Sequence, residues 1–145
     1  MQDAQNIKPT FDGLLSVVVP CRDEERALPI FISEFSKVAG QMGNPRFELI
    51  FVDDGSSDAT ADVLKKFAAD DSRIRYILFS RNFGKEAAMY AGLREARGDF
   101  ITVMDADMQD PPSLLPQMFD ALLNGGYDSC LLYTSPSPRD LSTSR

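Results

Sequence analysis

"FELIFVDDGSSDATADVLKKFAADDSRIRYILFS", residues 47–80, contains one complete strand–helix–strand unit. It begins and ends with apolar runs, at 47–54 and 73–80, that are rich in β-branched and aliphatic residues. Nearly continuous apolar character, rather than strict alternation, is typical of strands that are buried on both faces of a parallel sheet. Between the two runs, the residues at helical spacing are Ala61, Leu64, Phe67 and Ala68. The stretch therefore predicts two parallel strands connected by a helix.

The same alternation covers most of the chain. Further strand-like runs and helical patterns lie at 14–20, 24–39, 84–99 and 99–107, and a fourth helix is expected from Pro111 and Pro112 onward. Strand and helix alternate four times, at intervals of about 26 to 33 residues, close to the size of a βαβ unit. We therefore expect an α/β fold, with a doubly wound, mostly parallel, Rossmann-like sheet and right-handed crossovers.

Residue types at the ends of the helical patterns predict where the helices begin and stop. Ser56, Ser57 or Asp58 can cap the helix of the opening stretch, because their side-chain oxygens accept hydrogen bonds from first-turn amides. Gly98 follows the next helical pattern and is expected to end that helix.

Length and composition predict one folded domain that is preceded by an N-terminal arm and followed by a C-terminal tail. A domain of about 150 residues buries roughly 70% of its unfolded surface, enough for a substantial core. We expect an N-terminal arm at 1–13, a domain at 14–128 and a disordered tail at 129–145, where Ser, Thr and Pro replace any periodic pattern. The tail resembles translated adapter sequence, so we expect it to be non-native and the sheet to be truncated; a genuine flexible tail is the alternative.

The charge and residue content exclude several classes of function. A net charge of −7 and a pI near 4.5 argue against nucleic acid as a partner, because phosphate neutralisation needs clustered Lys and Arg. The chain has no histidine, and its two cysteines, Cys21 and Cys130, form no CxxC motif. Zinc fingers, disulfide scaffolds and His-dependent triads are therefore excluded. The apolar run at 14–20 is too short to span a bilayer, so we expect a soluble chain of cytoplasmic character.

Polar clusters follow each of the four expected strands. They are PCRDEE, DDGSSD, SRNFGKE and DADMQD. In open α/β sheets, ligands bind at the carboxyl ends of the strands. We therefore expect the four loops to converge on one site.

The fourth cluster contains a candidate metal site. If the strand continues past Met104, then Asp105, Asp107 and Gln109 point to one face. Hard oxygen ligands suit Mg²⁺ or Mn²⁺, which usually take one or two protein carboxylates and fill the remaining positions with water and substrate phosphates. The alternative is an Asp-rich turn in which Asp110 caps the following helix.

The second and third clusters contain candidate groups for a nucleotide. Asp53 and Asp54 are adjacent, so in an extended segment they face opposite ways and have different roles. One can bind a nucleobase or ribose while the other supports the turn at Gly55. Arg81 and Lys85 lie near the expected rim, where a helix N-terminus could also favour a diphosphate. Turn, capping and solvated surface roles remain the alternatives.

Four segments together resemble a known family. VVVPCRDEE, ELIFVDDGSSDAT, SRNFGKEAAMYAGLREARGD and MDADMQDPP are similar to family 2 glycosyltransferases of the GT-A fold, in the branch that acts on polyprenyl phosphates. The resemblance implies that Asp53, Asp54 and the segment from Pro20 through Arg22 and Asp23 to Glu24 hold the nucleotide. It further implies that Asp105, Asp107 and Gln109 organise the metal, with Asp107 as the catalytic candidate. The family commonly has Tyr-Asn where this chain has Arg22 and Asp23; an arginine plane can stack on a base in a similar way.

The resemblance also implies a reaction and its partners. An inverting transferase would move a sugar from a nucleotide-sugar donor, with UDP-glucose favoured over GDP-mannose, to a polyprenyl phosphate. The longer protein would act at the cytoplasmic face of the inner membrane, and an unpaired sheet edge could favour a homo-oligomer. Two other classes remain as alternatives, an Asp-based phosphotransferase and a receiver-type phosphoacceptor domain.

Overall fold

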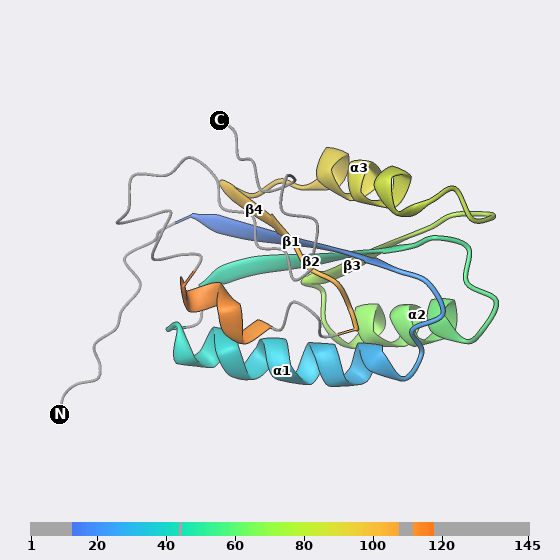
Figure 1. Ribbon diagram of the computed structural model, residues 1–145. Coiled ribbons are helices and arrows are strands. Elements are labelled where there is room, and N and C mark those ends of the chain that lie inside the picture. The colour runs from blue at the N-terminus through green and yellow to red at the C-terminus, as the bar shows by residue number, and fades with distance from the viewer. Residues whose placement is uncertain (1–12, 44, 108–111, 118–145) are drawn as a thin grey trace, which may run out of the picture.

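The computed structural model describes residues 13–43, 45–107 and 112–117. Its centre is a parallel four-stranded sheet with the order β3-β2-β1-β4 (Figure 1). The strands are β1 (Leu14–Cys21), β2 (Arg46–Asp53), β3 (Ile74–Leu78) and β4 (Phe100–Val103). This is the Rossmann-type strand order, whereas a receiver-type sheet would place β3 beside β1.

Helices cover both faces of this sheet. They are α1 (Ala27–Gln41), α2 (Thr60–Asp70) and α3 (Lys85–Glu95), followed by the short η2 (Pro112–Leu114). Figure 1 shows α1 and α2 on one face and α3 on the other. The predicted α/β, doubly wound, parallel fold is therefore confirmed. The fourth predicted helix is described only at its start, and the proposed arm and tail lie outside the described residues except for Gly13.

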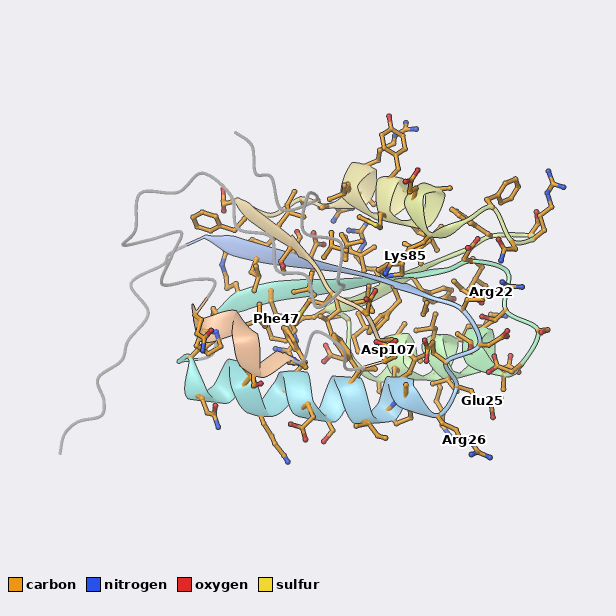
Figure 2. All side chains as sticks on the ribbon, in the orientation of Figure 1. Arg22, Glu25, Arg26, Phe47, Lys85 and Asp107 are labelled. Atoms are coloured by element: carbon orange, nitrogen blue, oxygen red, sulfur yellow. The ribbon has the colours of Figure 1, made fainter. Side chains whose placement is uncertain are left out.

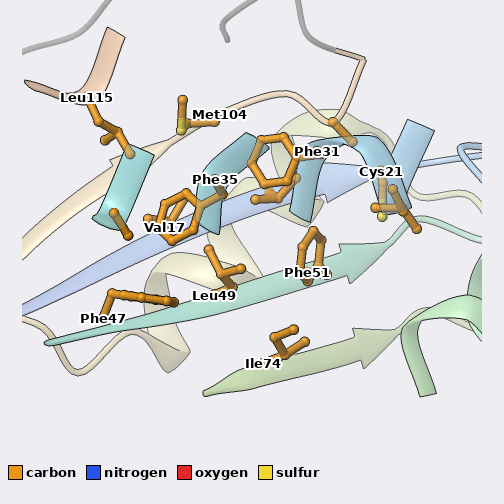
Figure 3. Packing of buried hydrophobic residues seen from close by; sticks show 14 of the residues in the cluster. Val17, Cys21, Phe31, Phe35, Phe47, Leu49, Phe51, Ile74, Met104 and Leu115 are labelled. Atoms are coloured by element: carbon orange, nitrogen blue, oxygen red, sulfur yellow. The ribbon is translucent and has the colours of Figure 1, made fainter. Parts of the chain in front are cut away.

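Aromatic packing fills the face beneath α1 and α2, as Figure 3 shows. Phe31 and Phe35 project from α1 and meet alternate residues of β2. The ring centroids of Phe35 and Phe47 are 4.7 Å apart, and those of Phe31 and Phe51 are 6.0 Å apart, both in edge-to-face geometry. Such pairs add about 0.5–1.5 kcal/mol to the stabilisation from buried area. This face therefore contains the main core.

Small residues and polar groups fill the opposite face, beneath α3. Ile50, Val52 and Ala88 form a minor buried cluster there. A Cβ on Gly92 would lie 2.3 Å from Cγ1 of Val18, so glycine allows the helix to approach the sheet closely. Toward the amino ends of the strands, the buried Glu48 accepts hydrogen bonds from the Ser16 hydroxyl at 2.6 Å, the Arg97 N–H at 2.8 Å and the Arg75 guanidinium at 2.8 Å.

Two predicted element ends differ from the structure. β4 stops at Val103, and a turn covers Ala106 and Asp107, so the expected extension of the strand past Met104 is wrong. Helix α3 ends at Glu95, because Ala96 is already extended. Gly98 has another role: its Cβ would lie 2.6 Å from the Ser16 Oγ atom, so glycine permits the chain to pass close to β1.

The start of α2 also differs from the prediction. Its N-cap is Ala59, which makes no side-chain capping bond. Asp58, one residue earlier, nevertheless accepts the Thr60 N–H at 2.9 Å. The carboxylate therefore supports the first turn without occupying the N-cap position.

Candidate functional site

A cavity of about 440 Å³ opens at the carboxyl end of the sheet. All four predicted loops contribute to it. The predicted site residues that line it are Pro20, Arg22, Glu24, Asp54, Lys85, Asp105 and Asp107. Figure 2 shows Arg22, Lys85 and Asp107 toward one end of the sheet and Phe47 at the other. The convergence of the loops, expected from the sequence, is therefore present among the described residues.

Carboxylates and one lysine face each other inside this cavity. The Lys85 Nζ atom lies 2.8 Å from the Asp105 Oδ1 atom, and the two side chains are 60% and 20% exposed. Burial and the nearby charges of Asp107 and Asp105 raise the pKa of Glu24 above its ordinary value. The cavity lining thus carries the carboxylates of Glu24, Asp54, Asp105 and Asp107, which the Lys85 ammonium and Arg22 guanidinium groups offset only in part, a setting that favours a cation.

The donor set fits Mg²⁺ or Mn²⁺ bound together with a phosphate ligand. Within the described ranges, no group of three His, Cys, Asp or Glu side chains is arranged to hold a metal by itself. Asp105 and Asp107 nevertheless line the same cavity, and these hard cations commonly use one or two carboxylates and complete their shell with water and phosphate oxygens. The third predicted ligand, Gln109, lies outside the described residues.

The two adjacent aspartates after β2 have separate environments. Asp54, which is 5% exposed, accepts the Phe83 N–H at 2.7 Å and the Gly84 N–H at 3.0 Å, and it borders the cavity. Asp53 lies outside the cavity lining and accepts the Ser56 N–H at 3.0 Å. Their opposite orientation agrees with the expectation that they have different roles. Asp53 supports the turn at Gly55, and Asp54 holds the loop that leads into α3.

Asp23 is also outside the cavity lining, although the resemblance placed it at the nucleotide. Its φ angle of 55° is in the left-handed region, which Asp tolerates better than most residues. Its carboxylate accepts the Ser57 N–H at 2.8 Å, while its own N–H donates to the Ser56 Oγ atom at 2.7 Å. Asp23 therefore fastens the loop after β1 to the loop after β2.

A second set of contacts strengthens this connection between the two loops. The Glu24 N–H donates to the Thr60 Oγ1 atom at 2.9 Å, and the Ala59 N–H donates to the Glu25 Oε1 atom at 2.9 Å. Arg22 and Glu24, the two cavity residues on the first loop, are thereby held against the start of α2.

Arg81 does not join the cavity. Its guanidinium carbon lies 4.7 Å from the centre of the Phe83 ring on the outer side of the third loop. The lining residues that the sequence analysis did not select are Cys21, Asn82, Gly84, Ala88 and Ala106. Asn82 could have been selected from the sequence as a site residue, because it lies in the polar cluster after β3. Burial, followed by the charges of Asp53 and Glu24, raises the pKa of the Cys21 thiol, which agrees with a packing role.

Comparison with known proteins identifies the family. The model of the family described as "Glycosyl transferase family 2" matches residues 16–136. The chain belongs to glycosyl transferase family 2. This family 2 chain is 40% identical over 115 residues to an undecaprenyl-phosphate 4-deoxy-4-formamido-L-arabinose transferase of Pectobacterium carotovorum, covering 79% of the chain and 35% of that protein. It is 39% identical over 109 residues to the prophage bactoprenol glucosyl transferase homolog of Escherichia coli K12, covering 73% of the chain and 34% of that protein.

The family 2 chain thus spans about a third of the length of these relatives. Among solved structures, a mannosyltransferase of Pyrobaculum calidifontis, in complex with GDP-Man and Mn²⁺, has a TM-score of 0.67 at 22% identity, covering 81% of this chain and 34% of that one. TarS 1–349 of S. aureus, in complex with UDP-GlcNAc, has a TM-score of 0.53 at 23% identity, covering 64% and 26%. At this identity the structural likeness supports the GT-A fold.

Among the described residues of the family 2 chain, no helix is both long enough and apolar enough to cross a membrane.

Proposed function

We propose that this chain forms the donor-binding part of an inverting glycosyltransferase that moves a sugar from a nucleotide-sugar to a polyprenyl phosphate. The observation that carries the proposal is the cavity where Lys85, Asp105 and Asp107 meet the loops after β1 and β2, in a chain of glycosyl transferase family 2. The names of the two relatives above support a polyprenyl-phosphate acceptor. Family membership favours this function over both alternatives, and the strand order argues further against a receiver-type domain.

The geometry suggests how the donor would lie. Pro20, Arg22 and Glu24 form one wall of the cavity, and Lys85 lies at the start of α3 with Asp105. We assign the nucleoside to the side of Arg22, whose guanidinium plane can stack on a base, and the diphosphate to the side of Lys85. Asp23 and Asp53 would act indirectly, because their carboxylates bind the backbone of the second loop.

A divalent cation, Mg²⁺ or Mn²⁺, would be held by Asp105 and Asp107, with Gln109 proposed as a further ligand. When bound, such an ion neutralises the charge that develops on the leaving diphosphate. Asp107, as the proposed catalytic residue, would hold the cation beside the leaving diphosphate. The Mn²⁺ present with the Pyrobaculum mannosyltransferase supports a divalent ion of this kind.

The acceptor chemistry needs no strong protein base. A phosphate oxygen of the lipid attacks the anomeric carbon, the bond from that carbon to the diphosphate breaks, and the nucleoside diphosphate leaves with the bonding electrons. A phosphate monoester has a second pKa near 6, so at neutral pH it is largely dianionic and already nucleophilic. The absence of histidine from the sequence is therefore compatible with this reaction.

Several finer points belong to the proposal. UDP-glucose is the favoured donor, with GDP-mannose as the second candidate. The longer protein would work at the cytoplasmic face of the inner membrane, where its lipid acceptor is found, and it could assemble as a homo-oligomer. The donor domain would occupy 14–128, between an arm at 1–13 and a non-native tail at 129–145.

The metal assignment is tested by calorimetric titration of UDP and GDP with and without Mn²⁺. We expect Asp107→Ala to weaken Mn²⁺-dependent nucleotide binding by at least about tenfold, because a ligand to the cation is lost. Asp62→Ala, at an exposed position on α2, is the matched control and should bind as the parent chain does. Full metal-dependent binding by Asp107→Ala, with an unchanged circular dichroism spectrum, would remove Asp107 from the site.

Transfer itself is tested with radiolabelled sugar and undecaprenyl phosphate in detergent. We expect little transfer by this chain and efficient transfer by a version with the natural continuation, because in-line positioning of reactants is worth about 7–11 kcal/mol of barrier. Equal transfer by both would show that the donor part positions the acceptor too.

A further inference from the structure

The ion pair between Lys85 and Asp105 lies inside the cavity that is assigned to the donor and the cation. Lys85 is the first residue of α3, and its ammonium group reaches across the cavity to the loop after β4, with 2.8 Å between the Lys85 Nζ and Asp105 Oδ1 atoms. Asp105 is one of the two carboxylates assigned to the cation. The pair therefore places a positive charge where a metal ion would also be attracted.

This position is unusual for a lysine on electrostatic grounds. The amino end of a helix carries a partial positive charge, which favours anions and disfavours a cationic side chain in the first turn. Lys85 is placed at that end of α3, beside the carboxylates of Asp105, Asp107 and Glu24 that line the same cavity. A lysine so placed gains attraction from these carboxylates, and it would gain more from an anionic ligand of higher charge.

We propose that Lys85 substitutes for the divalent cation beside Asp105 before ligands bind, and transfers to the diphosphate when metal and nucleotide arrive. This inference rests on the function proposed above. With the lysine beside Asp105, a divalent ion entering alone meets a competing like charge. Once a diphosphate is present, the ammonium group has a new partner, and Asp105 becomes available to the metal.

The consequence is a mutual dependence of metal and nucleotide binding. Any ligand that draws Lys85 away from Asp105 raises the affinity for the metal, and by linkage the metal raises the affinity for that ligand to the same extent. The long, flexible lysine stem suits such a movement, since the Lys85 side chain is 60% exposed. The site would therefore bind a metal ion more weakly when the donor is absent.

The test is Mn²⁺ binding to the full 145-residue chain, followed by the electron paramagnetic resonance signal of free Mn²⁺, with and without UDP or GDP. For Lys85→Met we expect Mn²⁺ alone to bind about fivefold more tightly, the lower end of typical coupling factors, and the enhancement by nucleotide to shrink by about the same factor, since coordination of the cation by phosphate oxygens remains. Lys85→Arg keeps a positive charge beside Asp105, so its affinity for Mn²⁺ alone should stay near that of the parent chain. Lys37→Met is the matched control, because it removes a lysine from an exposed ion pair with Glu34 on α1.

The outcomes separate this inference from the proposed function. If the parent chain binds UDP or GDP but Lys85→Met has unchanged Mn²⁺ affinity, the inference is wrong and the proposed function stands. The inference is equally overturned if Lys85→Arg tightens Mn²⁺ binding as Lys85→Met does, because charge would then not be the cause. If neither nucleotide binds the parent chain at saturating Mn²⁺, the proposed function fails, and the inference with it. Melting temperatures of all variants establish that each is folded.

Discussion

The two faces of the sheet are packed by different kinds of residue. Beneath α1 and α2, stacked and edge-to-face phenylalanines form a continuous apolar core, whereas beneath α3 the sheet meets glycine, alanine and a buried carboxylate. The cavity opens at the carboxyl end of the sheet, where Lys85 and Ala88 of α3 lie on its wall together with Cys21 and Ala106 of the larger core cluster. The α1 face thus supplies most of the apolar core, whereas α3 supplies a small residue and a charged one to the cavity.

The largest expected effect comes from removing an aromatic ring from the α1 face. Phe35→Ala should reduce the free energy of unfolding by about 3–5 kcal/mol, because the buried ring leaves a cavity among close-packed neighbours. Urea denaturation measures this change. The matched control is Phe83→Ala, since that ring is 51% exposed on the third loop; a loss of similar size there would contradict the comparison of the two faces.

On the α3 face, the largest effect should come from Glu48. Glu48→Gln should cost about 2 kcal/mol, because charge-assisted hydrogen bonds from Ser16, Arg75 and the Arg97 backbone are weakened. Glu95→Gln removes the exposed second partner of Arg75 and should cost less than about 1 kcal/mol. Both losses are measured by urea denaturation at pH 7. Equal losses in the two variants would show that the buried hydrogen bonds of Glu48 stabilise the domain no more than the exposed ion pair of Glu95 does.

The same carboxylate gives the domain a pH dependence with a defined sign. Burial acts to raise the pKa of Glu48, but the hydrogen bonds from Ser16, Arg97 and Arg75 outweigh it, and its pKa lies below the ordinary value. A carboxylate with a lowered pKa contributes stability above its unfolded pKa of about 4.3 and loses it as pH falls through the folded value. The gap between the parent chain and Glu48→Gln should be constant from about pH 7 to 5.5 and shrink as the pH falls below the unfolded value of about 4.3. A constant gap down to pH 3 would contradict this.

A smaller effect is expected where α3 approaches the sheet. Gly92→Ala should destabilise by about 1 kcal/mol, because overpacking against Val18 exceeds the gain in helix propensity. In a Val18→Ala background, the same substitution should become neutral or stabilising, which a double-mutant cycle measures. Gly40→Ala on α1 is the control, since its Cβ would meet no atom within 4 Å and should stabilise the helix.

An effect on stability similar to that at Gly92 should come from Asp23, which joins the first two loops. Asp23→Ala should cost roughly 1 kcal/mol from its left-handed backbone alone, whereas Asp23→Gly and Asp23→Asn should cost less. Nucleotide affinity should follow another order: Asn retains binding, while Gly and Ala weaken it because the contact with Ser57 is lost. Equal affinity of the Asn and Gly variants in calorimetry would show that this contact does not position Arg22 and Glu24.

Sequence patterns predicted the fold well because buried parallel strands have a strong local signature. The apolar runs around Val17, Leu49 and Ile74 became strands that are parallel to one another, as expected. The end of β4 at Val103 had no such signature, since the residues after it form a turn fixed by tertiary contacts. Gly98 was misinterpreted for a similar reason, because its constraint comes from Ser16, 82 residues away.

For the site, the sequence predicted which loops converge but not which side chains face inward. The carboxylates of Asp23, Asp53 and Asp54 all accept backbone N–H groups, but Asp54 alone of the three also borders the cavity, and only the three-dimensional arrangement distinguishes them. The pairing of Lys85 with Asp105 joins two loops from different strands and has no local sequence signal. The metal and nucleotide roles of these residues remain predictions.

The position of β1 at the centre of the sheet has a consequence during synthesis. Its partners are β2 and the much later β4, and the Leu14 N–H finally binds the Asp99 carboxylate, 85 residues downstream. At about 5–20 residues per second, a ribosome needs roughly 4 to 17 s to make that intervening chain. Throughout this interval one edge of the most apolar strand lacks its β4 neighbour. Until β4 is made, this unpaired edge is open to pairing with another chain, so the nascent protein is exposed to edge-to-edge association in that interval.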